Sequence, residues 1–269
     1  MEHRPLGRSG LQVPVVGMGT WKTFDVRGER TILDRRCVAD AAICAGTRLF
    51  DTSPMYGNAQ DVLSQATRAR RDDVLIADKI WTPSPSEAQA QIRRSLNWYC
   101  DRVDIYQIHN LVGWREHLPV LEKMRERGEV RVIGATHYSH GAFKELMTVM
   151  RTGRISMVQI PYNAADRVVE REVLPLAAEL GLGVLVMQPL ATGALVSRSP
   201  DASEFAALRK FGVKTWAQAL LKWILSDRRV SAVLPATSKA ERAEENAQAG
   251  NPPWFDDGAR DHVSALLAR

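Results

Sequence analysis

Short apolar runs alternate with longer amphipathic segments along the chain, and this alternation constrains the fold more than any other feature. Strands are expected at eight runs: Val13–Met18, Arg48–Asp51, Val74–Lys79, Val103–His109, Val130–Thr136, Ser156–Gln159, Gly183–Gln188 and Val230–Pro235. Strand and helix repeated without a break in composition predict a single-domain (β/α)8 barrel over residues 1–269. The first run is expected either as a barrel strand or as part of an N-terminal β-hairpin.

Helical patterns lie between these runs. In the first pattern, apolar residues recur every three or four positions, and Gly46 follows where a C′ glycine belongs. Cys37 and Cys44 lie seven apart in it and are therefore expected in the core. Ser84–Glu87 forms a capping box with proline at the first helical position. Further helices are expected near Arg115–Arg127, Gly141–Arg151, Glu170–Leu180, Thr215–Ser226 and Ala240–Ala247, with a short helix at the C-terminal end.

Composition excludes several classes of protein. The 269 residues are 45% hydrophobic and 25% charged, as in ordinary globular proteins. Three cysteines make neither a disulfide framework nor a zinc site, so no metal is expected. The first ten residues lack the apolar region of a secretory signal, and no apolar run approaches the roughly 20 residues that span a bilayer. A cytoplasmic protein that is not bound to a membrane is expected.

The formal net charge is +5, but the basic residues are scattered among acidic ones. Such a pattern is usually a solvated basic surface. The sequence shows no alternation of aromatic and basic residues of the kind that binds single strands, so no nucleic-acid partner is expected. Attraction of a phosphorylated small molecule is the better use of the excess charge.

Four residues mark the expected site: Asp51, Tyr56, Lys79 and His109. Three of them stand at the ends of successive predicted strands, and Tyr56 lies in the loop after the first. In a parallel barrel, the carboxyl ends of the strands open on the one face where such barrels carry out chemistry. Singly, each residue is more often structural, and their joint placement is what predicts a site.

The four residue types suit the protonation of a carbonyl. A free tyrosine has a pKa near about 10, and a lysine ammonium beside it would lower that pKa. Asp51 would keep Lys79 charged, and His109 would orient the carbonyl oxygen toward Tyr56. No nucleophile is evident, so a hydride from a nicotinamide is expected. The alternative, a Schiff-base lysine, needs an uncharged Lys79, which the adjacent Asp51 disfavours.

The chain resembles the aldo-keto reductases from about Gly17 to Asn246. The matching motifs are Gly17–Trp21, Asp51–Asn58, Lys79–Trp81, the strand ending in His109, Glu126–Thr136, Val158–Asn163, Gln188–Leu195 and Leu234–Asn246. The resemblance implies a TIM barrel that binds NADPH without a Rossmann glycine motif, with NADH binding more weakly. It implies Tyr56 as general acid, Lys79 and Asp51 as its tuning pair, and His109 as the residue that orients the carbonyl.

The resemblance also implies a cofactor site along the barrel mouth. Gln159 would bind the nicotinamide carboxamide, Arg242 the 2′-phosphate, and Glu245 and Asn246 the adenine. The implied positions are Thr20, Trp21, Thr136, His137, Gln159, Met187, Gln188, Pro189, Leu190, Gly193, Ala236, Thr237, Ser238, Arg242, Glu245 and Asn246. The chain departs from the common family pattern at His137, Met187 and Ala236, where many members have asparagine, an aromatic residue and, in some, lysine.

The expected substrate is a small aldehyde, ketone or quinone. Trp21, Trp81, Leu111 and Trp114 would line an aromatic mouth. The segment Leu190–Arg209 is long for a strand-to-helix loop, as lids are. The alternative function is an NADPH-binding sensor or regulatory subunit with weak turnover. A monomer or a small homo-oligomer is expected.

Overall fold

A computed structural model describes residues 1–268 and has eight parallel strands arranged as a barrel. Neighbouring strands follow one another in sequence order, from β3 to β10. The strands are β3 (Met18–Gly19), β4 (Leu49–Asp51), β5 (Leu75–Ile80), β6 (Val103–His109), β7 (Val130–Thr136), β8 (Met157–Pro161), β9 (Gly183–Met187) and β10 (Ala232–Val233). Parallel bridges from Val16 to Val233 and from Gly19 to Ala236 join the first strand to the last.

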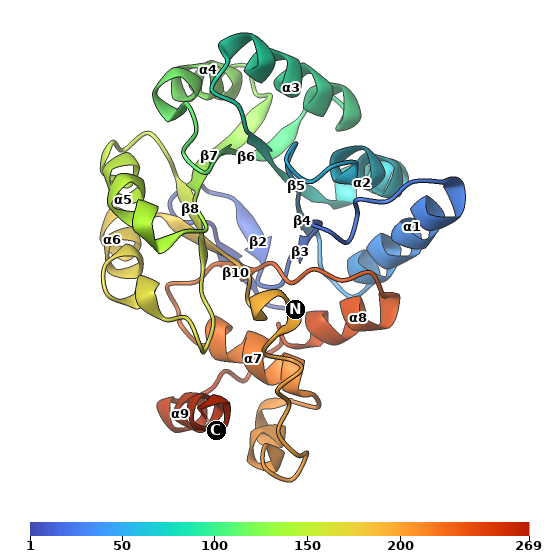
Figure 1. The fold of residues 1–269 in the computed structure, drawn as a ribbon, viewed down its shortest axis with the longest axis vertical. Coiled ribbons are helices and arrows are strands. Elements are labelled where there is room, and N and C mark those ends of the chain that lie inside the picture. The colour runs from blue at the N-terminus through green and yellow to red at the C-terminus, as the bar shows by residue number, and fades with distance from the viewer. Residues whose placement is uncertain (269) are drawn as a thin grey trace.

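Helices surround the strands in a ring, and α9 lies outside that ring beyond α7 (Figure 1). The helices are α1 (Glu29–Cys44), α2 (Ala59–Thr67), α3 (Pro85–Trp98), α4 (Trp114–Glu126), α5 (Phe143–Arg151), α6 (Val173–Leu180), α7 (Trp216–Leu225), α8 (Ala240–Gln248) and α9 (Asp257–Leu267). Ser84 caps α3 by accepting the backbone N–H of Glu87, and Gly46 follows α1 with φ +94°. The predicted barrel, the C-terminal helix, the glycine after α1 and the serine N-cap followed by proline are confirmed. The predicted capping box is only half formed, because the Ser84 N–H donates to Thr82 and the Glu87 side chain accepts from Arg94.

The first predicted strand is divided between two elements. β1 (His3–Pro5) and β2 (Gln12–Pro14) form an antiparallel hairpin, and Met18 begins β3. Leu6, Leu11 and Val13 of the hairpin region pack in one buried cluster with apolar side chains of the barrel strands, including Leu49 and Ile105. The hairpin thus covers the amino-terminal end of the barrel and leaves the carboxyl end for the site.

Gly17 shows why the entry into β3 is a glycine. A Cβ atom built there would lie 2.7 Å from a side-chain atom of Leu234 and 2.8 Å from the carbonyl oxygen of Leu49. Both distances are shorter than Cβ contacts allow, so no other residue lets the chain pass between β4 and the end of β10 without displacing one of them. The motif that begins at Gly17 is therefore partly a packing requirement.

The predicted burial of Cys37 and Cys44 is wrong, because both thiols are exposed. The buried stripe of α1 consists of Val38, Ala39, Ala42 and Ile43. Each cysteine lies one position outside that stripe, and one residue turns a helix by about 100°. Within residues 1–268, no helix is long and apolar enough to cross a membrane.

Candidate active site

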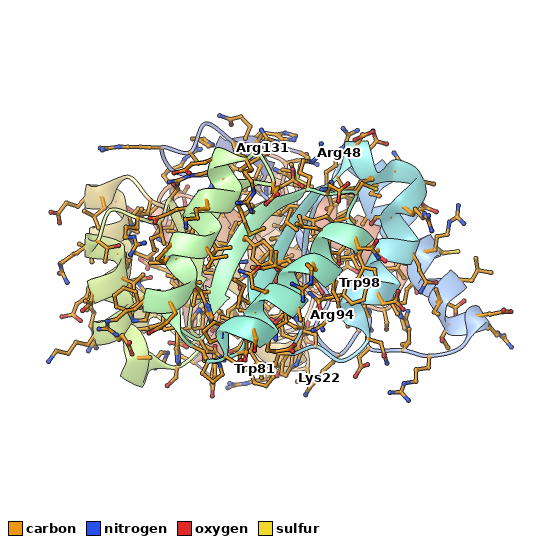
Figure 2. The ribbon with its side chains drawn as sticks, turned by 90° about the horizontal axis from the view of Figure 1, so that it is seen from above. Lys22, Arg48, Trp81, Arg94, Trp98 and Arg131 are labelled. Carbon is orange, nitrogen blue, oxygen red and sulfur yellow. The ribbon has the colours of Figure 1, made fainter. Side chains whose placement is uncertain are left out.

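Four predicted residues meet at the carboxyl end of the barrel. Asp51 closes β4, Lys79 lies one residue before the end of β5, and His109 closes β6. Tyr56 lies between β4 and α2, and its ring meets the His109 ring edge-on with centroids 5.8 Å apart. Figure 2 shows Trp81, just after β5, at one end of the barrel, with Arg48 and Arg131 at the other.

A buried ion pair is the centre of this cluster. Lys79 Nζ lies 2.7 Å from each carboxylate oxygen of Asp51 and donates a third bond of 2.7 Å to the carbonyl of Thr52. Burial is the largest single influence and lowers the pKa of Lys79, but Asp51, together with Tyr56 and Asp78, outweighs it and the pKa is raised. The lysine therefore remains an ammonium, which weighs against the Schiff-base alternative.

Two glutamine side chains complete the surroundings of Asp51. Gln159 Nε2 donates to its Oδ1 over 2.9 Å and Gln107 Nε2 over 3.2 Å. Gln107 Oε1 is buried and has no partner in the part of the chain that the structure describes. The sequence motifs include Gln159 but give no signal for Gln107, because an interior amide on a strand looks like any polar residue there.

Tyr56 is protonated at neutral pH, and its environment differs from expectation in one respect. Burial is the largest influence and raises the pKa of the phenol, while the charge of Lys79 lowers it and Asp51 raises it. The lysine acts in the predicted direction, and its Nζ lies 5.2 Å from the centre of the tyrosine ring. The prediction that the pKa of Tyr56 is lowered overall is nevertheless wrong, because the effect of burial is larger than that of the Lys79 ammonium.

His109 is a neutral imidazole. Burial, followed by the charge of Lys79 and the proximity of His137, lowers its pKa to about 2. Ser53 Oγ lies 2.7 Å from His109 Nδ1 and also accepts the backbone N–H of Met55 over 3.2 Å. Ser53 was not predicted as a site residue, although it belongs to the motif that carries Asp51 and Tyr56.

Two guanidinium groups lie by the start of α8. Arg242 is in its first turn, is exposed, and makes no ion pair within residues 1–268. Arg35 Nη1 donates to the carbonyl of Ser238 over 2.8 Å, and Arg35 Nε is buried without a partner in the same described range. Two cations beside a helix N-terminus form a donor set that suits a phosphate. Arg35 was not predicted, because α1 is remote from α8 in sequence.

Other predicted cofactor residues already have protein partners. Thr136 Oγ1 donates to Gln159 Oε1, and Thr20 Oγ1 to the carbonyl of Asp51. Glu245 accepts a 2.6 Å bond from Thr215 at the start of α7, and Asn246 is largely buried. These contacts fix the side chains in place, and a cofactor role for them stays a prediction.

The segment after β9 begins in an unusual conformation. Gln188, Ala191 and Thr192 have φ between +47° and +54°, which non-glycine residues adopt only at a cost. The carbonyl of Gln188 accepts a hydrogen bond from the side chain of Asn163. Asn163 ends the Val158–Asn163 motif but was not predicted as a site residue. The Leu195 carbonyl accepts the Trp216 indole N–H over 3.1 Å. The segment is thus anchored near its start, and a lid role stays a prediction.

Two of the four residues predicted to line the substrate mouth are exposed, and two are buried. Trp21 is 39% and Trp81 41% exposed, whereas Leu111 is buried and Trp114 is 8% exposed. The Trp114 indole donates to Glu145, so this ring packs between α4 and α5. Met55, in the Tyr56 loop, is 42% exposed and was not predicted. A substrate role for these residues stays a prediction.

Within residues 1–268, no group of three metal-ligating side chains is arranged to hold a metal ion. The site presents a partly buried phenol, an ammonium held by a carboxylate, and a neutral imidazole. Together they can polarise and protonate an oxygen atom.

Residues 15–260 match the model of the Aldo/keto reductase family. The chain is 26% identical to a methylglyoxal reductase of Escherichia coli (strain K12), covering 92% of this chain and 89% of the relative. It is also 26% identical to an L-galactose dehydrogenase of Arabidopsis thaliana, covering 93% and 88%. A probable voltage-gated potassium channel subunit beta of Arabidopsis thaliana is 27% identical, with 93% and 91% covered.

Among solved structures, an aldo-keto reductase from Klebsiella pneumoniae in complex with NADPH matches with a TM-score of 0.83 and 24% identity. The match covers 99% of this chain and 96% of the neighbour. At this identity the likeness supports the barrel architecture.

Proposed function

This chain belongs to the aldo/keto reductase family, and we propose that it reduces aldehydes, ketones or quinones with NADPH, using Tyr56 as the proton donor. The observation that carries the proposal is the pair of 2.7 Å contacts between the Lys79 ammonium and the Asp51 carboxylate, beside the partly buried phenol of Tyr56. A cation fixed next to a phenol stabilises the phenolate that is left when the proton is given up.

Each of the four residues has one task in the proposed reaction. Tyr56 gives its proton to the carbonyl oxygen, and Lys79 stabilises the resulting phenolate. Asp51 holds Lys79 in position and in its charged form. His109, neutral across the physiological range, donates an N–H to the carbonyl oxygen and so directs it toward Tyr56.

NADPH supplies the hydride when it is bound. The chain's own residues that would hold it are the ones around the barrel mouth, with Gln159 toward the nicotinamide and Arg242 toward the 2′-phosphate. Within residues 1–268, Arg242 makes no ion pair and Arg35 Nε has no partner, and both observations support this proposal. The named neighbour from Klebsiella pneumoniae was crystallised with NADPH and gives further support.

The 2′-phosphate assignment is tested by Arg242→Ala. Removing a charge-assisted hydrogen bond should weaken NADPH binding roughly tenfold or more, because such bonds contribute about 1.5–3 kcal/mol. NADH lacks the phosphate, so its dissociation constant should change little. Fluorescence titration of both nucleotides measures the difference, and Glu241→Ala on the same turn is the matched control. Equal losses for the two nucleotides would contradict the assignment.

The reaction is tested by following NADPH consumption with methylglyoxal, an aromatic aldehyde and a quinone, with product identification. Exposed aromatic rings at Trp21 and Trp81 favour substrates with an apolar body. Turnover with formation of the corresponding alcohol or hydroquinone supports the proposal. Tight NADPH binding without turnover of any carbonyl would contradict it.

A second candidate, an NADPH-binding regulatory subunit with weak turnover, has one observation in its favour. Relatives of similar identity include probable voltage-gated potassium channel beta subunits of Arabidopsis thaliana and Oryza sativa. The two proposals predict different turnover numbers at equal NADPH affinity, so the same assay separates them.

A further inference from the structure

We propose that Ser53 is a positioning residue that holds His109 in the tautomer with its proton on Nε2. The inference rests on the proposed reductase function and extends it to a residue with no assigned role. Ser53 lies in the tight turn after β4, three residues before Tyr56, and is completely buried. It therefore links the loop of the proton donor to the end of β6, which carries His109.

The hydrogen-bond roles of Ser53 follow from its two contacts. Its Oγ accepts the backbone N–H of Met55 over 3.2 Å, so the hydroxyl proton is free to be donated. The acceptor within reach is His109 Nδ1, 2.7 Å away. A buried hydroxyl that donated to nothing would cost free energy, so the arrangement that satisfies it has Ser53 O–H pointing at Nδ1.

The tautomer of His109 follows from that bond. Burial and the charge of Lys79 keep the ring neutral, so it carries one N–H only. If Nδ1 accepts from Ser53, the N–H is on Nε2. Within residues 1–268, Nε2 makes no hydrogen bond, which leaves it free to donate to a carbonyl oxygen. In the other tautomer, Nε2 would be an acceptor and would repel that oxygen.

The same bond also fixes the direction of the imidazole. The ring lies edge-on to Tyr56, with centroids 5.8 Å apart. The turn that holds Ser53 is stiffened by the following proline and by the bond from the Tyr56 N–H to the Ser53 carbonyl over 3.0 Å. The proton donor and the group that orients the carbonyl are therefore positioned by one turn.

The test combines imidazole ¹⁵N NMR with steady-state kinetics on wild type, Ser53→Ala and Ser53→Thr. The signals of His109, one of six histidines, are identified from the spectrum of His109→Gln. We expect a protonated Nε2 and an unprotonated Nδ1 in wild type and Ser53→Thr. In Ser53→Ala we expect mixed tautomers and a kcat/KM for the carbonyl that is lower by roughly 3- to 10-fold, the range of one net hydrogen bond. The dissociation constant for NADPH should not change.

Ser231→Ala is the matched control for a general loss of packing. Ser231 is also buried, accepts the N–H of Val184 and donates to the carbonyl of Pro5, at the opposite end of the barrel. It should lose comparable thermal stability and keep the wild-type tautomer and kinetics. A wild-type His109 protonated on Nδ1, or a Ser53→Ala variant with unchanged tautomer and kcat/KM, would overturn the inference.

The NMR arm does not depend on turnover. If the wild type reduced no carbonyl, the reductase proposal would fail, whereas the spectra would still decide whether Ser53 sets the tautomer of His109. A changed tautomer without any change in the kinetics would also overturn the positioning role.

Discussion

Two buried carboxylates lie on neighbouring strands and have different surroundings. Asp51, on β4, is 4% exposed and holds the Lys79 ammonium. Asp78, on β5, precedes Lys79 and is fully buried, but within residues 1–268 it makes no ion pair. Because successive side chains of a strand point to opposite faces, Lys79 enters the barrel while Asp78 faces the helices.

Neutral donors satisfy Asp78. Gln60 Nε2 on α2 donates to both of its oxygens, over 2.9 and 2.8 Å, and Ser95 Oγ on α3 donates over 2.6 Å. The backbone N–H of Lys79 donates a further bond of 2.8 Å. Burial outweighs these bonds and raises the pKa of Asp78. The carboxylate therefore ties β5 to two helices.

The difference teaches how one strand serves both structure and chemistry. On the inner face of the barrel, the Asp51 carboxylate pairs with Lys79 and keeps it protonated beside the Tyr56 phenol. On the outer face, the Asp78 carboxylate accepts hydrogen bonds from neutral donors and fixes β5 against α2, which follows the Tyr56 loop. Removing a charged group from the inner face should therefore abolish turnover, whereas removing Asp78 from the outer face should lower stability and leave turnover largely intact.

The largest expected effect is that of Lys79→Met. Turnover should fall roughly 100- to 1,000-fold, since single electrostatic groups of this kind contribute that much. The free energy of unfolding should fall by about 3–5 kcal/mol, because Asp51 is left buried without its partner charge. Carbonyl-dependent NADPH oxidation and urea denaturation measure the two losses.

The double variant Asp51→Asn/Lys79→Met sharpens this result. With no charge left uncompensated, much of the lost stability should return, but turnover should not. A double variant that regained turnover would show that the ion pair is structural, like the contacts of Asp78.

The second effect is a pH dependence of stability that comes from His109. Its pKa is about 2 in the folded protein, against an ordinary value of 6.5, so unfolding takes up a proton between these values. Stability from this group is complete above pH 6.5 and is lost as pH falls, by up to about 1.4 kcal/mol per pH unit. His109→Gln should flatten that slope between pH 4.5 and 6.5 in urea titrations. An unchanged slope would mean that the imidazole is not held neutral.

The smallest effect on activity is expected for Asp78→Asn. The free energy of unfolding should fall by about 1–3 kcal/mol, because the amide NH2 of asparagine cannot accept the hydrogen bonds that Gln60 and Ser95 donate to Asp78. The kcat should stay within about threefold of wild type. The raised pKa of Asp78 makes the wild-type protein lose stability from this group as pH rises from about 3.8 through the raised value. The difference between wild type and variant should therefore shrink with rising pH, the opposite trend to that of His109. A large fall in kcat would contradict a purely structural role.

The sequence predicted the barrel because its strands are apolar runs with well-separated helices between them. It predicted the meeting of Asp51, Lys79 and His109 because strand ends in a parallel barrel share one face. β3 and β10 have two residues each and are shorter than the apolar runs that predicted them, although isolated bridges at Val16–Val233 and Gly19–Ala236 extend their pairing.

Other features depend on distances that no pattern contains. The contact of Ser53 with His109 joins residues 56 apart, and that of Arg35 with Ser238 joins residues 203 apart. The balance at Tyr56 could not be foreseen, because burial and the lysine charge oppose each other and only the structure gives their relative size. The buried Trp114 ring donates its indole N–H to Glu145 in α5, 31 residues later, and no sequence pattern links the two.

The most direct test of the central claim is a single-turnover measurement of NADPH oxidation by wild type and Tyr56→Phe with the best carbonyl substrate. NADPH affinity is matched by titration, and Tyr138→Phe, an exposed tyrosine outside the cluster, is the control. We predict that hydride transfer in Tyr56→Phe is slower by at least about 1,000-fold, with unchanged NADPH binding, because the phenol proton has no replacement. Transfer at a rate close to wild type would contradict the role of the buried cluster as the proton-donating site.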